Sequence, residues 1–348
     1  MSQLLPTVGR WSVLVAAAAV VAACSDSSTT PSRDLSPSVS SANQYPEFNG
    51  PSADAHIMHT RPWFAANGNA HGKPGGGGGG SNGITYHGGQ VLLSGTNVVA
   101  VYWAASPIYN GAPAAGTHGA ITSDVSPDAS LVGYFLSHLG GSSYFNINST
   151  YTNGTTAIQN VVRYTAYWAN NSNVPSDGQS VSDAQIVAML QSGFSSGALS
   201  YDPATVYAVF TAGTVNLGGG FGKQYCAYHT HGTVTVDNTS KTVLYAAMPY
   251  NYAYPSACTN GTAAPNSDPG ADAEVNTLAH EIEETTTDLM GNAWYDFFGY
   301  ENADKCAWNF GTTQNNGQGV WNITIGTKQF LVQQNWINAS GGGCRQSW

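Results

Sequence analysis

Hydrophobic residues recur along this chain with two periods, one typical of buried strands and one typical of helices. Short, nearly continuous apolar runs that are rich in β-branched and aromatic residues predict strands that are covered on both faces. The predicted strands are residues 91–93, 97–103, 158–168, 205–211, 241–248, 320–325 and 329–334. Strands that are separated by helical segments indicate an α/β layered domain with a mixed sheet flanked by helices.

Three segments carry the signals of helices. The first is predicted to begin at Ser126, a favourable N-cap that precedes a proline and an amphipathic stretch. The second begins with the capping-box pattern of Ser182 and Gln185, and we expect it to end at Gly193. The third and longest is predicted over residues 271–289.

The N-terminus has the pattern of a targeting segment. Arg10 precedes an apolar run, residues 11–23, that is too short to span a bilayer and predicts a signal peptide over residues 1–23. The run ends in Val-Ala-Ala before Cys24, which resembles a bacterial lipobox and predicts lipidation of Cys24. Ser25 then suggests, by resemblance to lipoprotein sorting, an outer-membrane or cell-surface lipoprotein. Ordinary secretion with cleavage near Ala23 is the alternative.

The next segment, residues 24–83, has few apolar positions. It is rich in Ser, Thr and Pro at first and then in Gly, with six consecutive glycines. This composition predicts a disordered tether. We therefore expect the compact domain to occupy residues 84–348.

Charge and cysteine content narrow the class of protein. The net charge of −10, with only 9% charged residues, argues against nucleic acid or an anionic membrane surface as partners, and leaves the lipid anchor as the membrane contact.

Four cysteines remain after Cys24, and in an exported chain they predict two disulfides. Three pairings are possible. Proximity in the sequence favours Cys226 with Cys258 and Cys306 with Cys344.

The candidate chemistry lies in an acidic segment. Ten of the twenty carboxylates fall between Asp268 and Asp304, without any Lys or Arg, so they repel one another unless a cation or protons intervene. Within it, His280 and Glu284 are four residues apart and share a helix face, and Glu281 follows the histidine directly. This H-E-x-x-E pattern is similar to the H-E-x-x-H motif of zinc enzymes.

The pattern predicts a zinc site with His280, Glu284 and Glu301 as ligands and Glu281 as the general base. The spacing of Glu301 resembles that of gluzincin-type peptidases, and a zincin-like domain is the fold this resemblance implies. Asp304 would orient a ligand, and Asp288 is an alternative ligand or a partner of the helix end. Carboxylate ligands shift the metal preference of such a site toward harder ions. Structural Ca²⁺ is therefore the alternative cofactor. The alternative without a metal is that these carboxylates form an acidic helix face exposed to solvent.

Three further side chains are candidates near such a site. His229 and His231 form a His-x-His pair, which on a strand points to one side and could bind a metal or border the cleft. Tyr295 and the same two histidines are candidate donors to an oxyanion. The sequence does not choose among them.

Several short motifs occur in order along residues 84–310. They are Ile84-Thr85-Tyr86-His87-Gly88-Gly89, Val91-Leu92-Leu93-Ser94-Gly95, Val101-Tyr102-Trp103, Val181-Ser182-Asp183-Ala184-Gln185-Ile186, Cys226 with Thr230-His231-Gly232, and Asn276-Thr277-Leu278-Ala279. Together they resemble the EXORDIUM, or phosphate-induced protein, family. Similar plant proteins are secreted and wall-associated, without a settled enzymatic activity, and have small or apolar residues where this chain has the H-E-x-x-E motif. The chain thus resembles a bacterial branch that adds a metal site.

Two functions follow as hypotheses. The first is a secreted, lipid-anchored metallohydrolase, a zinc-dependent peptidase acting on a peptide or protein substrate. The second is a non-enzymatic surface protein of EXORDIUM type, which binds cell-wall glycan or a protein partner and holds a structural metal.

Overall fold

The computed structural model describes residues 51–67, 83–122, 127–261 and 264–348, all of which belong to one compact unit. The predicted signal peptide, the lipobox with Cys24 and most of the predicted tether lie outside the described residues. Of the predicted helix starts, Ser126 also lies outside them.

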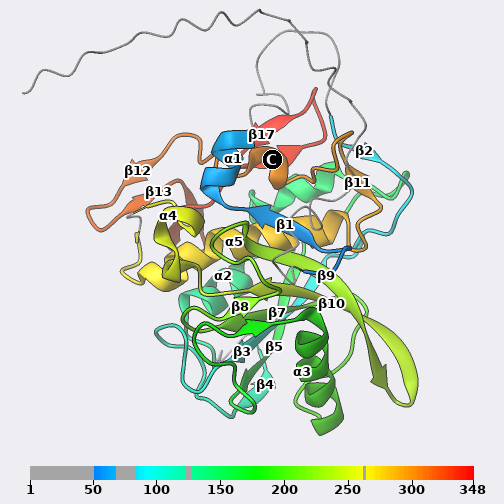
Figure 1. Cartoon of the computed structure of the whole chain (residues 1–348). Helices are drawn as coiled ribbons and strands as arrows, with labels where there is room; N and C mark the ends of the chain where they lie inside the picture. Colours follow the sequence, from blue (N-terminus) through cyan, green and yellow to red (C-terminus); the bar gives the residue numbers. More distant parts are fainter. Residues whose placement is uncertain (1–50, 68–82, 123–126, 262–263) are drawn as a thin grey trace, which may run out of the picture. The chain divides into compact units, whose positions relative to one another are not determined.

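A seven-stranded mixed sheet forms the centre of the domain, in the order β1-β9-β10-β7-β3-β5-β4 (Figure 1). Its strands are β1 (His56–His59), β3 (Thr96–Trp103), β4 (His118–Ala120), β5 (Val162–Asn170), β7 (Thr205–Thr211), β9 (Tyr225–Val236) and β10 (Thr239–Met248). The four central strands, β10, β7, β3 and β5, run parallel, and β1, β9 and β4 pair antiparallel at the two sides. The predicted mixed sheet is confirmed.

Alternate residues of the strands face two separate cores, as the pleat requires. Val98 and Ala100 point to the core that includes residues of α2 (Leu131–Leu139) and α5 (Pro269–Thr287). Val99 and Val101 point to the core on the other face, which is covered by α3 (Asp183–Ser196). Figure 1 shows α3 (green) and α5 (yellow-orange) on opposite sides of the strands. The layered α/β prediction is thus confirmed, and α5 faces one side of the sheet only.

The remaining elements are short and lie mostly in the C-terminal part. They are α1 (Arg61–Asn67), β2 (Thr85–Tyr86), η3 (Phe145–Thr150), β6 (Ser180–Val181), β8 (Asn216–Leu217), η4 (Asn251–Ala253), α4 (Pro255–Cys258), β11 (Trp294–Tyr295), η5 (Asp304–Cys306), β12 (Gln314–Asn315), β13 (Val320–Trp321), β14 (Ile323–Ile325), β15 (Lys328–Phe330), β16 (Asn335–Ile337) and β17 (Gly343–Arg345).

The domain begins earlier than the sequence predicts. Residues 56–67, which we expected in the tether, form β1 and α1, and β1 pairs antiparallel with β9. The pairing gives the otherwise open edge of β9 a hydrogen-bonding partner, and Met58 is fully buried in the process. The assignment of this part to a disordered tether was therefore wrong.

One predicted strand is absent and several element boundaries differ from the prediction, for example β5, which begins at Val162 and not at residue 158. Residues 91–93 are not a strand, because Leu92 N donates to Thr286 O and the chain turns before β3. Helix α2 begins at Leu131, with Ser130 as the N-cap. The capping box of α3 is confirmed, but the helix continues past Gly193 to the left-handed Gly197. Gly193 is there for close packing, since an added Cβ would lie 2.7 Å from Leu199.

Both predicted disulfides are present. Cys226 on β9 is bonded to Cys258 on α4, and Cys306 in η5 is bonded to Cys344 in β17. Two disulfides indicate an oxidising, exported environment. Across the described ranges, no helix combines the length and the hydrophobicity that crossing a bilayer requires.

Candidate metal centre

Helix α5 is buried along nearly its whole length, although a large share of its side chains is polar. Asp268 caps its N-terminus by accepting from Ala271 N, and Pro269 occupies the first turn. Further along, His280, Glu281 and Glu284 are all 0% exposed. The interpretation of this helix as a solvated acidic face is therefore wrong. Other groups inside the domain must compensate the hydration that these charged side chains lose on burial.

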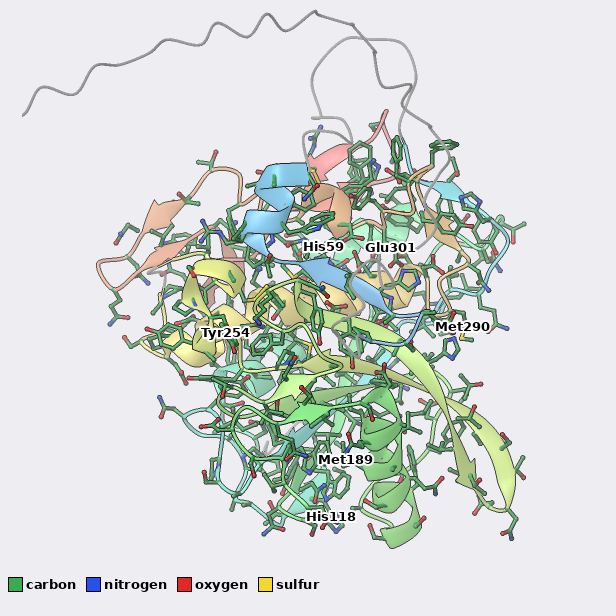
Figure 2. The ribbon with its side chains drawn as sticks, viewed as in Figure 1. His59, His118, Met189, Tyr254, Met290 and Glu301 are labelled. Carbon is green, nitrogen blue, oxygen red and sulfur yellow. A yellow bond between two sulfur atoms is a disulfide. The ribbon has the colours of Figure 1, made fainter. Side chains whose placement is uncertain are left out.

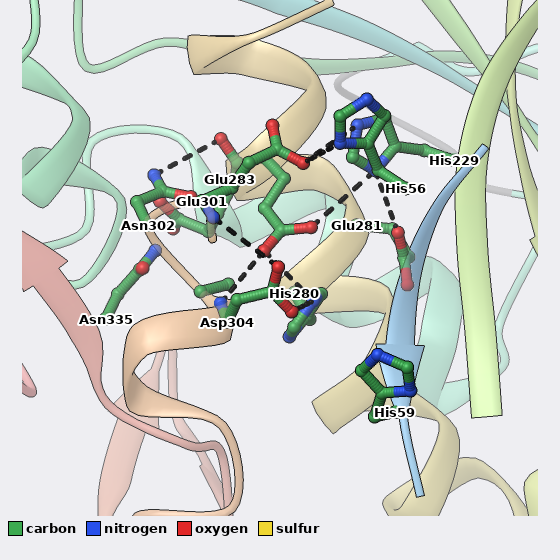
Figure 3. A network of polar contacts seen from close by, with 12 residues as sticks. His56, His59, His229, His280, Glu281, Glu283, Glu301, Asn302, Asp304 and Asn335 are labelled. Atoms are coloured by element: carbon green, nitrogen blue, oxygen red, sulfur yellow. Dashed lines mark hydrogen bonds and ion pairs between the residues drawn. The ribbon is translucent and has the colours of Figure 1, made fainter. Parts of the chain in front are cut away.

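Four parts of the chain contribute to one buried cluster around α5 (Figure 3). Helix α5 supplies the three residues of the H-E-x-x-E motif. Strand β9 supplies His229, and β1 supplies His56. The fourth part, the continuous stretch that follows β11 and ends in η5, supplies both Glu301 and Asp304.

His280 lies between two carboxylates and one amide. Its Nε2 is 3.1 Å from Glu284 Oε1 and 3.5 Å from Asp304 Oδ1. Burial disfavours its charged form, but the Glu284 and Asp304 carboxylates outweigh burial and raise the pKa of His280 well above its usual value. On the other side of the ring, Gln333 Nε2 donates to His280 Nδ1 at 3.0 Å.

His229 has a different environment. Its Nδ1 lies 3.0 Å from Glu281 Oε2, and its Nε2 lies 3.8 Å from Glu301 Oε2. Burial, assisted by the neighbouring His56 and His280, lowers the pKa of His229 well below its usual value. The ring is therefore neutral at neutral pH, which is the form that binds metals.

His56 and Glu301 meet at the open side of the cluster. His56 Nδ1 lies 2.6 Å from Glu301 Oε2, and the His56 ring stacks on His229 with centroids 5.2 Å apart. The side chain of His56 is 24% exposed, whereas that of Glu301 is buried. Solvent thus reaches the cluster on the His56 side.

Burial and mutual repulsion disfavour the ionised form of the carboxyl groups in the cluster. Burial, followed by neighbouring carboxylates, raises the pKa of Glu301 well above its usual value. Burial also raises the pKa of Glu281 well above its usual value, against the pull of His280, and raises that of Glu284. Without a cation, the cluster would have to take up protons to stay buried.

Several buried donor and acceptor atoms in this cluster lack a hydrogen-bond partner among the described residues. They are Nε2 of His229, Oε1 of Glu281, Oε2 of Glu284, Oε1 of Glu301 and Oδ2 of Asp288. Within the described ranges, Nε2 of His280 and Oε2 of Glu301 make only the ion-pair contacts given above. Orphaned polar atoms are rare in protein interiors, so this many in one place indicates that something else satisfies them.

Within the described ranges, three groups of side chains could each hold a cation. They are His56, His229 and Glu301; His229, Glu281 and Glu284; and His280, Glu284 and Asp304. Nitrogen and oxygen donors of this kind suit Zn²⁺ and similar ions. Of the predicted ligands, His280 and Glu284 lie together, but Glu301 falls in a different group and Asp304 takes the third place beside them.

The other predicted residues lie around the cluster or away from it. Asp288 caps the end of α5, where its Oδ1 accepts from Asn292 N at 2.6 Å and Ala293 N at 2.7 Å. His231 is on the same face of β9 as His229, two residues further along, but belongs to none of the three groups. Tyr295 stacks on His87 with centroids 3.8 Å apart and also stands outside those groups.

Sequence reasoning missed His56 and Gln333. His56 falls in a stretch whose composition suggested a tether, and the only signal was a pair of histidines around two apolar residues, His56-Ile57-Met58-His59. Gln333 carries no signal, because an isolated glutamine close to a C-terminal strand is unremarkable in a sequence.

Figure 2 shows His59 and Glu301 near β1, away from Met189 on α3.

A hollow on the opposite face of the sheet is separate from this cluster. A cavity of about 260 Å³ is lined by Trp103, Asn170 and Met189, on the α3 side of the sheet. The cluster lies on the α5 side. Within the cluster, the side chains of His56 and Asp304 are 24% and 12% exposed, so solvent reaches it there.

Fold and site together define an exported, disulfide-bonded α/β domain whose longest helix carries a buried histidine and carboxylate cluster. Residues 84–320 match the family described as the phosphate-induced protein 1 conserved region, and the chain belongs to that family. The predicted resemblance to the phosphate-induced protein family is thereby confirmed, and the resemblance of the H-E-x-x-E motif to zinc enzymes stays a prediction. Comparisons with curated proteins and with solved structures found no match. Strand β1 with His56 lies outside the matched residues.

Proposed function

We propose that this protein is an exported metal-dependent hydrolase, a zinc peptidase that binds its cation in the cluster around α5. The observation that carries the proposal is a set of buried imidazole and carboxylate atoms that converge from four separate parts of the chain, several of them without a hydrogen-bond partner among the described residues. Buried charges of one sign are tolerated in proteins mainly when an ion or protons neutralise them.

The chain's own residues would supply the remaining steps of hydrolysis. A bound Zn²⁺ lowers the pKa of its water to about 7 and polarises a carbonyl. Glu281 is the proposed general base, because its Oε1 has no partner among the described residues while Oε2 is held by His229. Peptide or protein is the proposed substrate.

We also propose that the protein is a lipoprotein. The lipobox before Cys24 supports lipid attachment at that residue, and Ser25 supports sorting to the outer membrane or cell surface. The two disulfides fit such an exported location.

Substitution of Glu281 tests the enzymatic role. Glu281→Gln keeps an oxygen that can accept from His229 but removes the base, so we expect hydrolysis of a peptide library to be lost while the bound metal is kept. The matched control is Glu283→Gln, another fully buried glutamate of α5, which belongs to none of the three donor groups. Full activity in Glu281→Gln would refute the proposed base.

A second candidate function rests on the burial of the cluster. His280, Glu281, Glu284 and Glu301 are all 0% exposed, and a closed site suits a structural ion. On this reading the protein is a non-enzymatic, wall-associated member of its family that binds glycan or a protein partner, and the ion is Zn²⁺ or Ca²⁺. A wild-type protein that binds cell-wall polysaccharide but cleaves no peptide would favour this function.

A further inference from the structure

The two buried histidines of the cluster differ in which ring nitrogen is free to bind a cation. A neutral imidazole has a proton on one nitrogen and a lone pair on the other, and only the lone pair can bind a metal. The partners of Nδ1 therefore decide what Nε2 can do.

In His280, Nδ1 accepts a hydrogen bond. Gln333 Nε2 donates to it at 3.0 Å and donates its second hydrogen to Ala303 O at 2.8 Å. Trp308 N donates to Gln333 Oε1 at 3.4 Å, which fixes the same orientation of the amide. The proton of a neutral His280 is therefore on Nε2, which faces Glu284 and makes His280 a donor to that carboxylate.

In His229, the opposite holds. Its Nδ1 lies 3.0 Å from Glu281 Oε2. When Glu281 is ionised, as it would be beside a bound cation, Nδ1 carries the proton and donates to it. Its Nε2 then carries the lone pair, is buried, and has no partner in the described part of the chain. Histidines that bind a metal through one ring nitrogen usually donate the N–H of the other nitrogen to a carboxylate or a similar acceptor.

Two other donors face this lone pair. Glu301 Oε2 lies 3.8 Å from His229 Nε2, and His56 Nδ1 lies 2.6 Å from the same oxygen. Without an ion this second contact requires a proton on His56 Nδ1. Since the His56 ring is 24% exposed, its proton can be released from Nδ1 and the ring protonated at Nε2 instead when an ion binds. Donors bound to one tetrahedral zinc ion at about 2.0–2.1 Å are about 3.3 Å apart, and the two distances fall on either side of that value. The other oxygen of Glu301, Oε1, lacks a hydrogen-bond partner among the residues described.

We infer that a divalent cation, with Zn²⁺ as the best fit, is bound by His229 Nε2, His56 Nδ1 and Glu301, and that Glu281 orients His229. This inference rests on the proposed function, because it names the ligands of the same cluster. Three protein donors leave a coordination position for water, as in catalytic zinc sites. His280 and Glu284 then form a neighbouring pair that is not required for binding the ion.

The consequence concerns the N-terminal strand. His56 belongs to β1, which lies outside the residues that match the family, yet it supplies one of the three donors. Strand β1 is held in place by its pairing with β9, in which His56 is opposite His229. The site is therefore incomplete without a segment that precedes the conserved region.

The test compares zinc binding by the full exported chain and three single variants. We expect His56→Ala to weaken zinc binding more than about 100-fold, since loss of an outer partner alone costs about 10–100-fold. The matched control is His59→Ala, a buried histidine on the same strand that belongs to none of the three donor groups. It should retain wild-type affinity, and His280→Ala should stay within about 10-fold of it. Affinity is measured by competition with a chromophoric chelator, and folding by circular dichroism.

X-ray absorption of the zinc-loaded wild type provides a readout that needs no variant. We expect two imidazole ligands and at least one carboxylate. A single imidazole, together with loss of zinc in His280→Ala and not in His56→Ala, would overturn the inference but leave the proposed function intact. A wild-type chain that binds no divalent cation would overturn both.

Discussion

Glu274 shows how α5 carries a buried carboxylate without a cation, and it gives a quantitative prediction. Its side chain is 0% exposed, and its two oxygens accept from the backbone and side-chain nitrogens of Asn251, each at 3.2 Å. Burial, partly offset by these hydrogen bonds, raises the pKa of Glu274 to about 8. At neutral pH this carboxyl group is therefore protonated.

The sign of the effect on stability follows from proton linkage. Below pH 4.5 the group is protonated in both the folded and the unfolded chain and adds no pH dependence. Between pH 4.5 and about 8 only the folded chain keeps the proton, so the free energy of unfolding falls as pH rises. At about 1.36 kcal/mol per pKa unit, the full window is worth at most about 5 kcal/mol.

Glu274→Gln should abolish this contribution, because an amide keeps the shape but cannot ionise. We expect the stability of the variant relative to wild type to increase by several kcal/mol between pH 5 and pH 8. Urea unfolding at each pH, with and without chelator, measures the difference. Asp237→Asn, at the exposed β9–β10 turn, controls for the loss of one acidic side chain. A relative stability that does not change between pH 5 and pH 8 would refute the reasoning.

Three further predictions follow from the structure. Removal of bound cation with a chelator should lower the free energy of unfolding by about 4 kcal/mol when the free ion was at 1,000 times its dissociation constant, measured by urea unfolding. Replacing Cys306 and Cys344 with alanine should cost about 4 kcal/mol, from a sequence separation of 38, and reduction of the wild type should match or exceed that loss. Gly193→Ala should lower the midpoint of thermal unfolding despite the better helix propensity of alanine, because the new methyl group meets Leu199 and Trp168, at a cost of about 1–3 kcal/mol. An unchanged or higher midpoint would contradict that packing argument.

The strongest local patterns predicted the fold well. Strand β7 was predicted with its observed bounds, and the acidic helix differs from α5 by only a few residues at each end. Both predictions depend only on local sequence patterns, such as an unbroken apolar run, and need no information about distant parts of the chain. The two disulfides were also predicted correctly, since each closes a short loop.

The candidate site was predictable only in part, because its completion depends on contacts between distant segments. The motif on α5 identified His280, Glu281 and Glu284, and the His-x-His pair identified His229. His56 could not be found in this way, because only its pairing with β9 brings it to the cluster. Nor could Gln333, although its amide determines which nitrogen of a neutral His280 carries the proton.

The metal content of the purified wild-type protein tests the central claim most directly. The chain should be isolated from its export compartment without added chelator, and the metal-to-protein ratio measured by elemental analysis. One tightly held zinc ion per chain, which dialysis does not remove, is the predicted result. A folded, disulfide-bonded chain that contains no divalent cation and takes up none from micromolar zinc would contradict the account.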